Sequence, residues 1–248
     1  MTDPDSMAHS VPVTLSPVAA AMRLLQFGDS MLPVGSFAFS AGLESAVERG
    51  VVHDVATLRG FVTTATRQAA TADGVALLHA HRAAAAGDLD AVMAADHAVF
   101  QRKLNEEART MTTRMGRKLA ELGDRVVGGS AERQRLLPDW LAAMRDGSTP
   151  GTFPVGLGVL FGVLGSPETD AFAVHQYGVA FTIVSAALRL MRIDHLDTQA
   201  ILFQVDATAA HAYAAVRDAA LSDMAGFAPM TDILAAVHAR AHVRLFMS

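Results

Sequence analysis

The chain has 248 residues, of which 51% are hydrophobic and 18% charged, so it can bury a sizeable core and is not disordered over most of its length. Its formal net charge of −5 argues against a nucleic-acid-binding surface, which needs a basic excess. It has no cysteine, which excludes disulfides, thiolate metal sites and a cysteine nucleophile, and is typical of a cytoplasmic protein.

The composition favours helices. Alanine is abundant, aromatic residues make up only 6%, and runs of β-branched residues are short. We therefore expect an all-α fold, a single helical-bundle domain of about ten helices over residues 16–248. Residues 1–15 carry acids and no apolar stretch of signal-peptide length, and we expect them to form a disordered tail.

The first helix is expected to begin at Pro17, with Ser16 as its N-cap, and to end near Gly28. After it comes a segment of small and aromatic residues, called here the signature loop, which reads Leu32-Pro33-Val34-Gly35-Ser36-Phe37-Ala38-Phe39-Ser40-Ala41-Gly42-Leu43-Glu44. Pro33 fixes φ and Gly35 permits a positive φ. Phe37 and Phe39 fall on one side if the loop is extended. No catalytic constellation accompanies the loop, so we interpret it as a recognition element.

Helical segments with short connections follow. Asp54 is placed to cap a helix that runs to about Ala70, and a second helix is expected over residues 72–86. The most charged helix is expected between about Asn105 and Leu122. Its arginines, Arg109, Arg114 and Arg117, suggest a finger that stabilises charge on a partner's nucleotide. The favoured reading is a solvated helix with charge pairs three or four residues apart.

Two long stretches carry no charged residue, at residues 147–167 and 171–188. A membrane hairpin is one reading, but both stretches are near the minimum length of about 18–20 residues, and the first contains several prolines and glycines. Buried helices of a bundle are the favoured reading. Gly158 and Gly162 form a G-x-x-x-G pattern, which indicates close helix packing.

Familiar catalytic motifs are absent: the chain has no P-loop, no H-E-x-x-H and no G-x-S-x-G. It has ten histidines. His238 and His242 are four residues apart on an expected helix and are weak candidates for metal ligands, because two ligands alone do not make a strong site. His79 and His81 would diverge, and Asp194, His195 and Asp197 form a possible polar cluster. We expect no resident metal or cofactor and no catalytic residue.

The signature loop resembles the pattern L-P-[VI]-G-G-[FY]-[ST]-[YF]-S-[QH]-G-[LM]-E of the UreF family of urease accessory proteins, and ten of its thirteen positions agree. The departures are Ser36, Ala38 and Ala41. Further matches follow in the family's order: Arg114-Met115-Gly116-Arg117-Lys118-Leu119 is similar to Q-M-G-R-x-L, and Arg244-Leu245-Phe246-Met247-Ser248 to R-L-F-x-S. Phe153-Pro154-Val155 matches H-[YF]-P-[VA] except that Thr152 replaces the histidine. Ile193-Asp194-His195-Leu196 replaces the usual L-G-Q, and Gln199 matches a later glutamine.

The resemblance implies a non-enzymatic, nickel-insertion chaperone in the cytoplasm. Such proteins bind UreD (UreH), recruit the UreG GTPase and help to deliver nickel to apo-urease with GTP hydrolysis, nickel being transient cargo. They tend to form homodimers and bind neither nucleic acid nor membranes. The expected partner-binding residues lie in the three matching segments: Leu32, Pro33, Gly35, Phe37, Phe39, Gly42, Glu44, Arg114, Arg117, Arg244, Leu245 and Phe246. The alternative is a small helical metal-binding protein or enzyme that uses His238 and His242.

Overall fold

The computed structural model describes residues 16–29, 31–127, 132–226, 233–234 and 245–246. Over these residues the chain forms helices and turns and no strand, which confirms the all-α prediction. The α-helices are α1 (Pro17–Gly28), α2 (Leu43–Glu48), α3 (Val55–Ala69), α4 (Val75–Ala86), α5 (Leu89–Gln101), α6 (Glu106–Val127), α7 (Glu132–Asp146), α8 (Phe153–Val163), α9 (Glu168–Leu190) and α10 (His195–Val216). Three short elements complete the set: η1 (Ser36–Ala38), η2 (Ala70–Gly74) and η3 (Leu221–Asp223). The tail expected over residues 1–15 lies outside the described residues.

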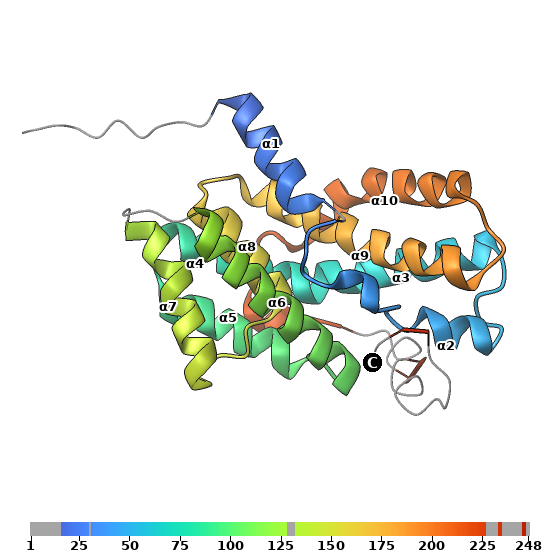
Figure 1. Ribbon diagram of the computed structural model, residues 1–248, viewed down its shortest axis with the longest axis horizontal. Coiled ribbons are helices and arrows are strands. Elements are labelled where there is room, and N and C mark those ends of the chain that lie inside the picture. The colour runs from blue at the N-terminus through green and yellow to red at the C-terminus, as the bar shows by residue number, and fades with distance from the viewer. Residues whose placement is uncertain (1–15, 30, 128–131, 227–232, 235–244, 247–248) are drawn as a thin grey trace, which may run out of the picture.

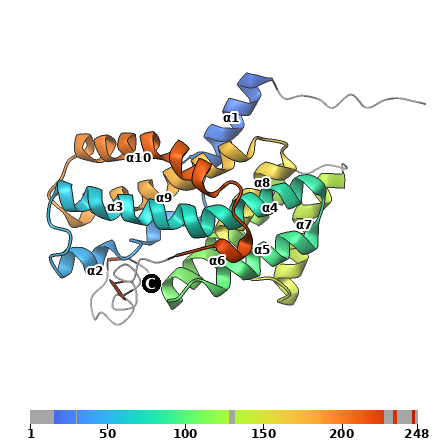
Figure 2. The ribbon, with the colours of Figure 1, turned by 180° about the vertical axis from the view of Figure 1, so that it is seen from behind.

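The helices fall into two groups that share one long helix. Helices α4 to α8 gather at one end of the molecule and α2, α3 and α10 at the other, while α1 projects from the body (Figures 1 and 2). Each group has its own buried apolar cluster, the first around Trp140 and Phe161 and the second around Leu43 and Leu58. Helix α9 contributes to both clusters, so it joins the two groups into one body.

The sequence predicted two separate helices over these residues, but α3 and α4 are joined. Residues 70–74 form a π-helical turn, η2, and the backbone stays right-handed helical at both of its ends. A π turn inserts an extra residue and so shifts the phase of the buried stripe. Leu58 and Val62 of α3 pack in the second cluster, whereas Leu77 of α4 packs in the first. The turn lets one continuous helix serve both cores, as Figure 2 shows.

The two uncharged stretches form buried helices. Helix α8 has 11 residues, too few to cross a membrane, and every one after Phe153 is buried. Its Gly158 and Gly162 face α4: a Cβ at Gly158 would collide with the carbonyl oxygen of Leu77, and one at Gly162 would lie 2.6 Å from that of His81. Helix α9 is long and apolar enough to span a membrane by length and composition, and 56% of its most apolar window is buried inside the protein.

A buried carboxyl group holds the turn before α8. Asp96 of α5 is fully buried, and its two oxygens accept four hydrogen bonds of 2.6–2.8 Å. The donors are the hydroxyl groups of Thr149 and Thr152 and the backbone N–H groups of Gly151 and Thr152. Thr152, which departs from the family pattern, therefore has a structural role here: it contributes two of the four donors and is the N-cap residue of α8.

Helix packing at Gly158 supplies a first test. Gly158→Ala should lower the free energy of unfolding by about 1–3 kcal/mol, because the new methyl group forces α8 away from the α4 backbone. Gly60→Ala is the matched control: Gly60 is exposed on α3 with nothing within 4 Å of its Cβ position, so this change should raise stability by about 0.5–1 kcal/mol. Urea unfolding followed by circular dichroism measures both. Equal effects would contradict the packing account.

Asp96 supplies a second test. Asp96→Asn puts an amide NH2 where one carboxyl oxygen accepted two hydrogen bonds, so two buried donors lose their acceptor. We expect a loss of about 3 kcal/mol in the free energy of unfolding. Asp90→Asn, in the exposed first turn of the same helix, should change it by less than about 0.5 kcal/mol. A small effect of Asp96→Asn in the same urea titration would show that the turn does not depend on this group.

Candidate functional site

The signature loop is a compact turn rather than an extended strand. Gly35 has φ +87° and Gly42 φ +81°, conformations that an L side chain rarely adopts, and η1 lies between them. The 3-10 turn sends the two aromatic side chains to different environments: Phe37 is 43% exposed, whereas Phe39 is 3% exposed. The expectation that both fall on one side is therefore wrong, because it assumed an extended backbone. Only Phe37 can present its ring to a partner.

The C-terminal residues dock beside this loop. The backbone N–H groups of Leu245 and Phe246 donate to the two carboxyl oxygens of Glu44, at 2.8 and 3.3 Å. Glu44 is 3% exposed and Phe246 4% exposed, whereas Leu245 is 72% exposed. Glu44 and Phe246 thus hold the segment in place, and Leu245 is the residue that it displays. Arg244 lies outside the described residues.

Arg189 of α9 connects the loop to the C-terminal residues. Its guanidinium donates to the carbonyl oxygen of Phe37 at 3.1 Å and lies over the ring of Phe246, 4.1 Å from the centroid. The ring of Phe37 packs edge-on against Phe181 of the same helix, with 6.3 Å between centroids. We call the exposed patch formed by Phe37, Arg189 and Leu245 the loop–tail face. It joins segments that are about 200 positions apart in the sequence.

Helix α6 borders the loop on another side. The Nζ atom of Lys118 lies 3.4 Å from the position that a Cβ on Gly35 would occupy. Arg114 and Arg117 are exposed on the same helix, and Arg117 lies 3.9 Å from Glu121, one turn on. Arg109 instead donates to the carbonyl oxygen of Lys103 and covers the ring of Phe100. Arg114 and Arg117 are therefore exposed on α6, whereas Arg109 contacts its own chain through Lys103 and Phe100.

The motif glycine of α6 explains why this helix lies where it does. A Cβ on Gly116 would collide with the carbonyl oxygen of Gly151 and lie 2.6 Å from the carbonyl carbon of Thr152. Gly116 thus lets α6 lie directly on the turn that Asp96 holds. The glycine of the Arg114–Leu119 motif is therefore required for helix packing. The exposed arginines of the same motif form a candidate surface.

A partly buried ion pair lies behind the signature loop. Lys103, in the connection between α5 and α6, reaches Asp73 of η2 with Nζ 2.6 and 2.7 Å from the carboxyl oxygens. Nε2 of His175 on α9 is 3.8 Å from Oδ2 of Asp73. Burial by itself would raise the pKa of Asp73, but the ammonium group of Lys103 and the imidazole of His175 outweigh it and hold that pKa well below its usual range.

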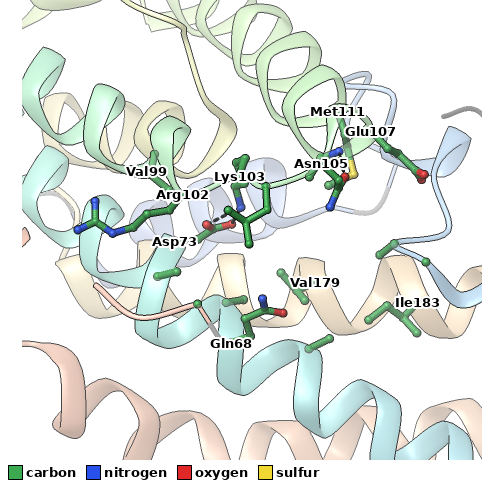
Figure 3. A pocket seen from close by; sticks show the side chains of 18 residues that line it. Gln68, Asp73, Val99, Arg102, Lys103, Asn105, Glu107, Met111, Val179 and Ile183 are labelled. Carbon is green, nitrogen blue, oxygen red and sulfur yellow. Dashed lines mark hydrogen bonds and ion pairs between the residues drawn. The ribbon is translucent and has the colours of Figure 1, made fainter. Parts of the chain in front are cut away.

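The ion pair lines a cavity of about 170 Å³ between α3, α6 and α9 (Figure 3). Its polar lining residues include Gln68, Arg102, Asn105 and Glu107, and Val179 and Ile183 of α9 are among the apolar ones. Ala41 of the signature loop also lines this cavity. Its φ is +52°, the one positive value outside glycine among the described residues. Ala41 stands where the family pattern has a polar residue.

The histidines do not form a metal centre in the described part of the chain, where no group of three or more His, Cys, Asp or Glu residues could hold an ion. His79 and His81 bond the carbonyl oxygens of Ala219 and Ser166. Asp194 and Asp197 form the capping box of α10, beginning at His195. His238 and His242 lie outside the described residues.

Sequence reasoning missed Arg189, Asp73 and Lys103. One signal was present for the last of these: the chain has two lysines, Lys103 and Lys118, among 20 basic residues. Lys103 lies behind the signature loop and Lys118 lies beside it. An ammonium group presents a compact charge to a single partner, unlike the planar fork of arginine. The rarity of lysine could have singled out both positions, but not their partners.

The chain is similar in sequence to proteins of known family. The UreF family model matches residues 52–206. The urease accessory protein UreF 2 of Brucella canis is 56% identical over 227 residues, which is 92% of this chain and 91% of that protein. The urease accessory protein UreF of Yersinia pseudotuberculosis is 49% identical over 225 residues, 91% of this chain and 96% of that protein. The chain belongs to the UreF family of urease accessory proteins.

Proposed function

We propose that this chain is a non-catalytic scaffold of urease maturation in the cytoplasm, which binds UreD (UreH) and the UreG GTPase during GTP-dependent delivery of nickel to apo-urease. The observation that carries the proposal is the loop–tail face, where the signature loop and the C-terminal residues meet. Phe37 and Leu245 are exposed to solvent on this face. Arg189 donates to the backbone carbonyl of Phe37, and Glu44 accepts the backbone N–H of Leu245. Aromatic residues and arginine are enriched in protein interfaces, and this face exposes Phe37 and Arg189 together.

The contacts beneath this face connect the signature loop to the C-terminal residues. Glu44 accepts two backbone N–H groups of the C-terminal residues, and Arg189 contacts both the loop and Phe246. A partner that binds either segment therefore depends on both. The basic residues Arg114, Arg117 and Lys118 on α6 border the loop, so the surface suits a partner with acidic groups. Nickel is cargo of the assembly in this proposal and not a resident cofactor of the chain.

We also propose that two copies pair through α1 and its neighbours. Helix α1 projects from the body (Figure 1) and exposes Val18, Met22 and Leu25. An open groove of about 470 Å³ lies between α1, α9 and α10, lined by Leu24, Leu25, Tyr177 and Asp206 among others. Phe203 of α10 is 77% exposed. A second copy would cover this apolar surface, which a monomer leaves in water.

Partner binding is tested by co-expression of tagged chain with its cognate UreD and UreG and recovery of the complex. Phe37→Ala and Leu245→Ala should each weaken retention of at least one partner by roughly tenfold or more, because each removes an exposed anchor. The matched control is Leu196→Ala, which truncates an equally exposed leucine at the start of α10. Phe39 is left unchanged because it is buried. Retention of both partners by both variants would refute this role for the loop–tail face.

Dimer formation is tested by light scattering on the purified chain. Wild type should have twice the mass of one chain, and Leu25→Asp should shift it toward the single-chain mass, because a carboxylate would be buried at the contact. Val126→Asp, at an exposed position of α6 away from α1, should leave the mass unchanged. A single-chain mass for wild type, or an unaltered mass for Leu25→Asp, counts against pairing through α1.

A further inference from the structure

The guanidinium of Arg189 is held in one orientation although the side chain is exposed. One of its N–H groups donates to the carbonyl oxygen of Phe37 at 3.1 Å, and its Cζ atom lies 4.1 Å from the ring centroid of Phe246. Phe246 is itself buried, and its backbone N–H donates to Glu44. A cation that is fixed in this way loses little conformational entropy when it binds a further group.

Most of the hydrogen-bonding capacity of Arg189 is unused by its own chain. A guanidinium has five N–H donors, and among the described residues only the carbonyl of Phe37 accepts from this one. No carboxylate in the described part of the chain forms an ion pair with Arg189, whereas Arg82, for comparison, pairs with Glu168. Arg189 is therefore suited to bind an anionic group of another molecule.

A shallow depression lies beside this guanidinium. Its described lining combines two aromatic rings, three hydroxyl-bearing residues and one basic residue: Ser36, Phe37, Phe181, Thr182, Ser185 and Arg189. Ser36 is one of the departures from the family pattern, which has glycine at that position. Serine and threonine hydroxyl groups can donate hydrogen bonds to an anion. The depression thus offers one charge and several polar groups next to the exposed ring of Phe37.

A carboxylate fits this depression better than a phosphate does. The planar fork of a guanidinium matches the two oxygens of one carboxylate. Phosphoryl groups are typically recognised by clusters of arginines, and Arg189 is the one basic residue among the described residues of the lining. The chain as a whole carries a net charge of −5, which disfavours polyanions such as nucleic acids and anionic membranes.

We propose that Arg189 binds the side-chain carboxylate of an aspartate or glutamate on the protein partner that covers the loop–tail face. The inference rests on the proposed function of that face and adds the chemistry that the partner must present there. An exposed ion pair contributes little to binding. This pair contributes more because a bound partner, packed on Phe37 and Leu245, excludes water and lowers the effective dielectric constant around it.

The experiment measures the affinity of the full chain for its cognate UreD and UreG at roughly 50 and 300 mM NaCl, which screen exposed charges weakly and strongly. Arg189→Gln keeps an amide donor for the carbonyl of Phe37 but removes the charge. It should weaken binding of the partner that depends on Phe37 by roughly tenfold or more, and the remaining affinity should fall less on addition of salt. Arg145→Gln, at an exposed position of α7 in the other helix group, is the matched control and should change neither quantity.

Charge exchange separates a direct contact from a purely structural role of Arg189. Arg189→Glu should abolish binding, and replacement of one aspartate or glutamate of the partner by arginine should restore it. The same replacement should not restore binding to Phe37→Ala, which lacks the ring but keeps Arg189. Each partner variant is also measured against the wild-type chain, where the one that removes the paired carboxylate should weaken binding by roughly tenfold or more. This arm stands even if the Arg189 variants do not fold.

Two results would overturn this inference and leave the proposed function in place. One is binding that Phe37→Ala weakens and Arg189→Gln leaves unchanged. The other is the absence of any acidic residue on the partner whose replacement weakens binding to the wild-type chain. Failure of the wild-type chain to bind either partner would remove the proposed function and this inference with it. Binding of the chain alone to phosphatidylserine vesicles, lost in Arg189→Gln, would assign the face to a membrane instead.

Discussion

The four hydrogen bonds that Asp96 accepts fix the turn on which three helices converge. Helix α8 starts from this turn and packs its glycines against α4. Helix α6 rests on the turn through Gly116. The position of α6 in turn sets Lys118 against the signature loop. A single buried carboxyl group thus determines the relative placement of helices that surround the candidate site.

Glu44 repeats this arrangement at the other end of the molecule. Like Asp96 it is buried, and like Asp96 it receives backbone N–H groups from a distant part of the chain. Carboxyl groups accept such bonds strongly and need no particular side chain from the segment that they hold. The segment's side chains remain free for other contacts, as Leu245 illustrates by its exposure. At each end of the structure a buried carboxyl group therefore fixes a distant backbone segment through hydrogen bonds.

Much of the fold was accessible from the sequence, because its signals are local. Ser16 caps α1, Asp54 caps α3, and the G-x-x-x-G of α8 marks a close helix contact. The π turn η2 was not accessible: the sequence indicated a break near residue 71, whereas the chain stays helical there and the phase shift is set by two separate cores. The family resemblance marked the loop, the α6 motif and the C-terminal residues as partner-binding segments, but it did not predict that they meet. The basis of their convergence, Arg189 and Glu44, depends on contacts across about 150 to 200 positions, which no local pattern encodes.

The π turn also constrains how this family can change over evolutionary time. Helices α3 and α4 form one rod whose buried stripe passes from one core to the other at η2. A gain or loss of one residue within the rod would turn everything beyond it by about 100° and carry Leu77 and Leu78 away from the α8 side. A change of length in an exposed connection has no such effect. Between Asp54 and Gly87 a change of length would therefore disturb the packing of both cores unless a second π turn or its loss restored the phase.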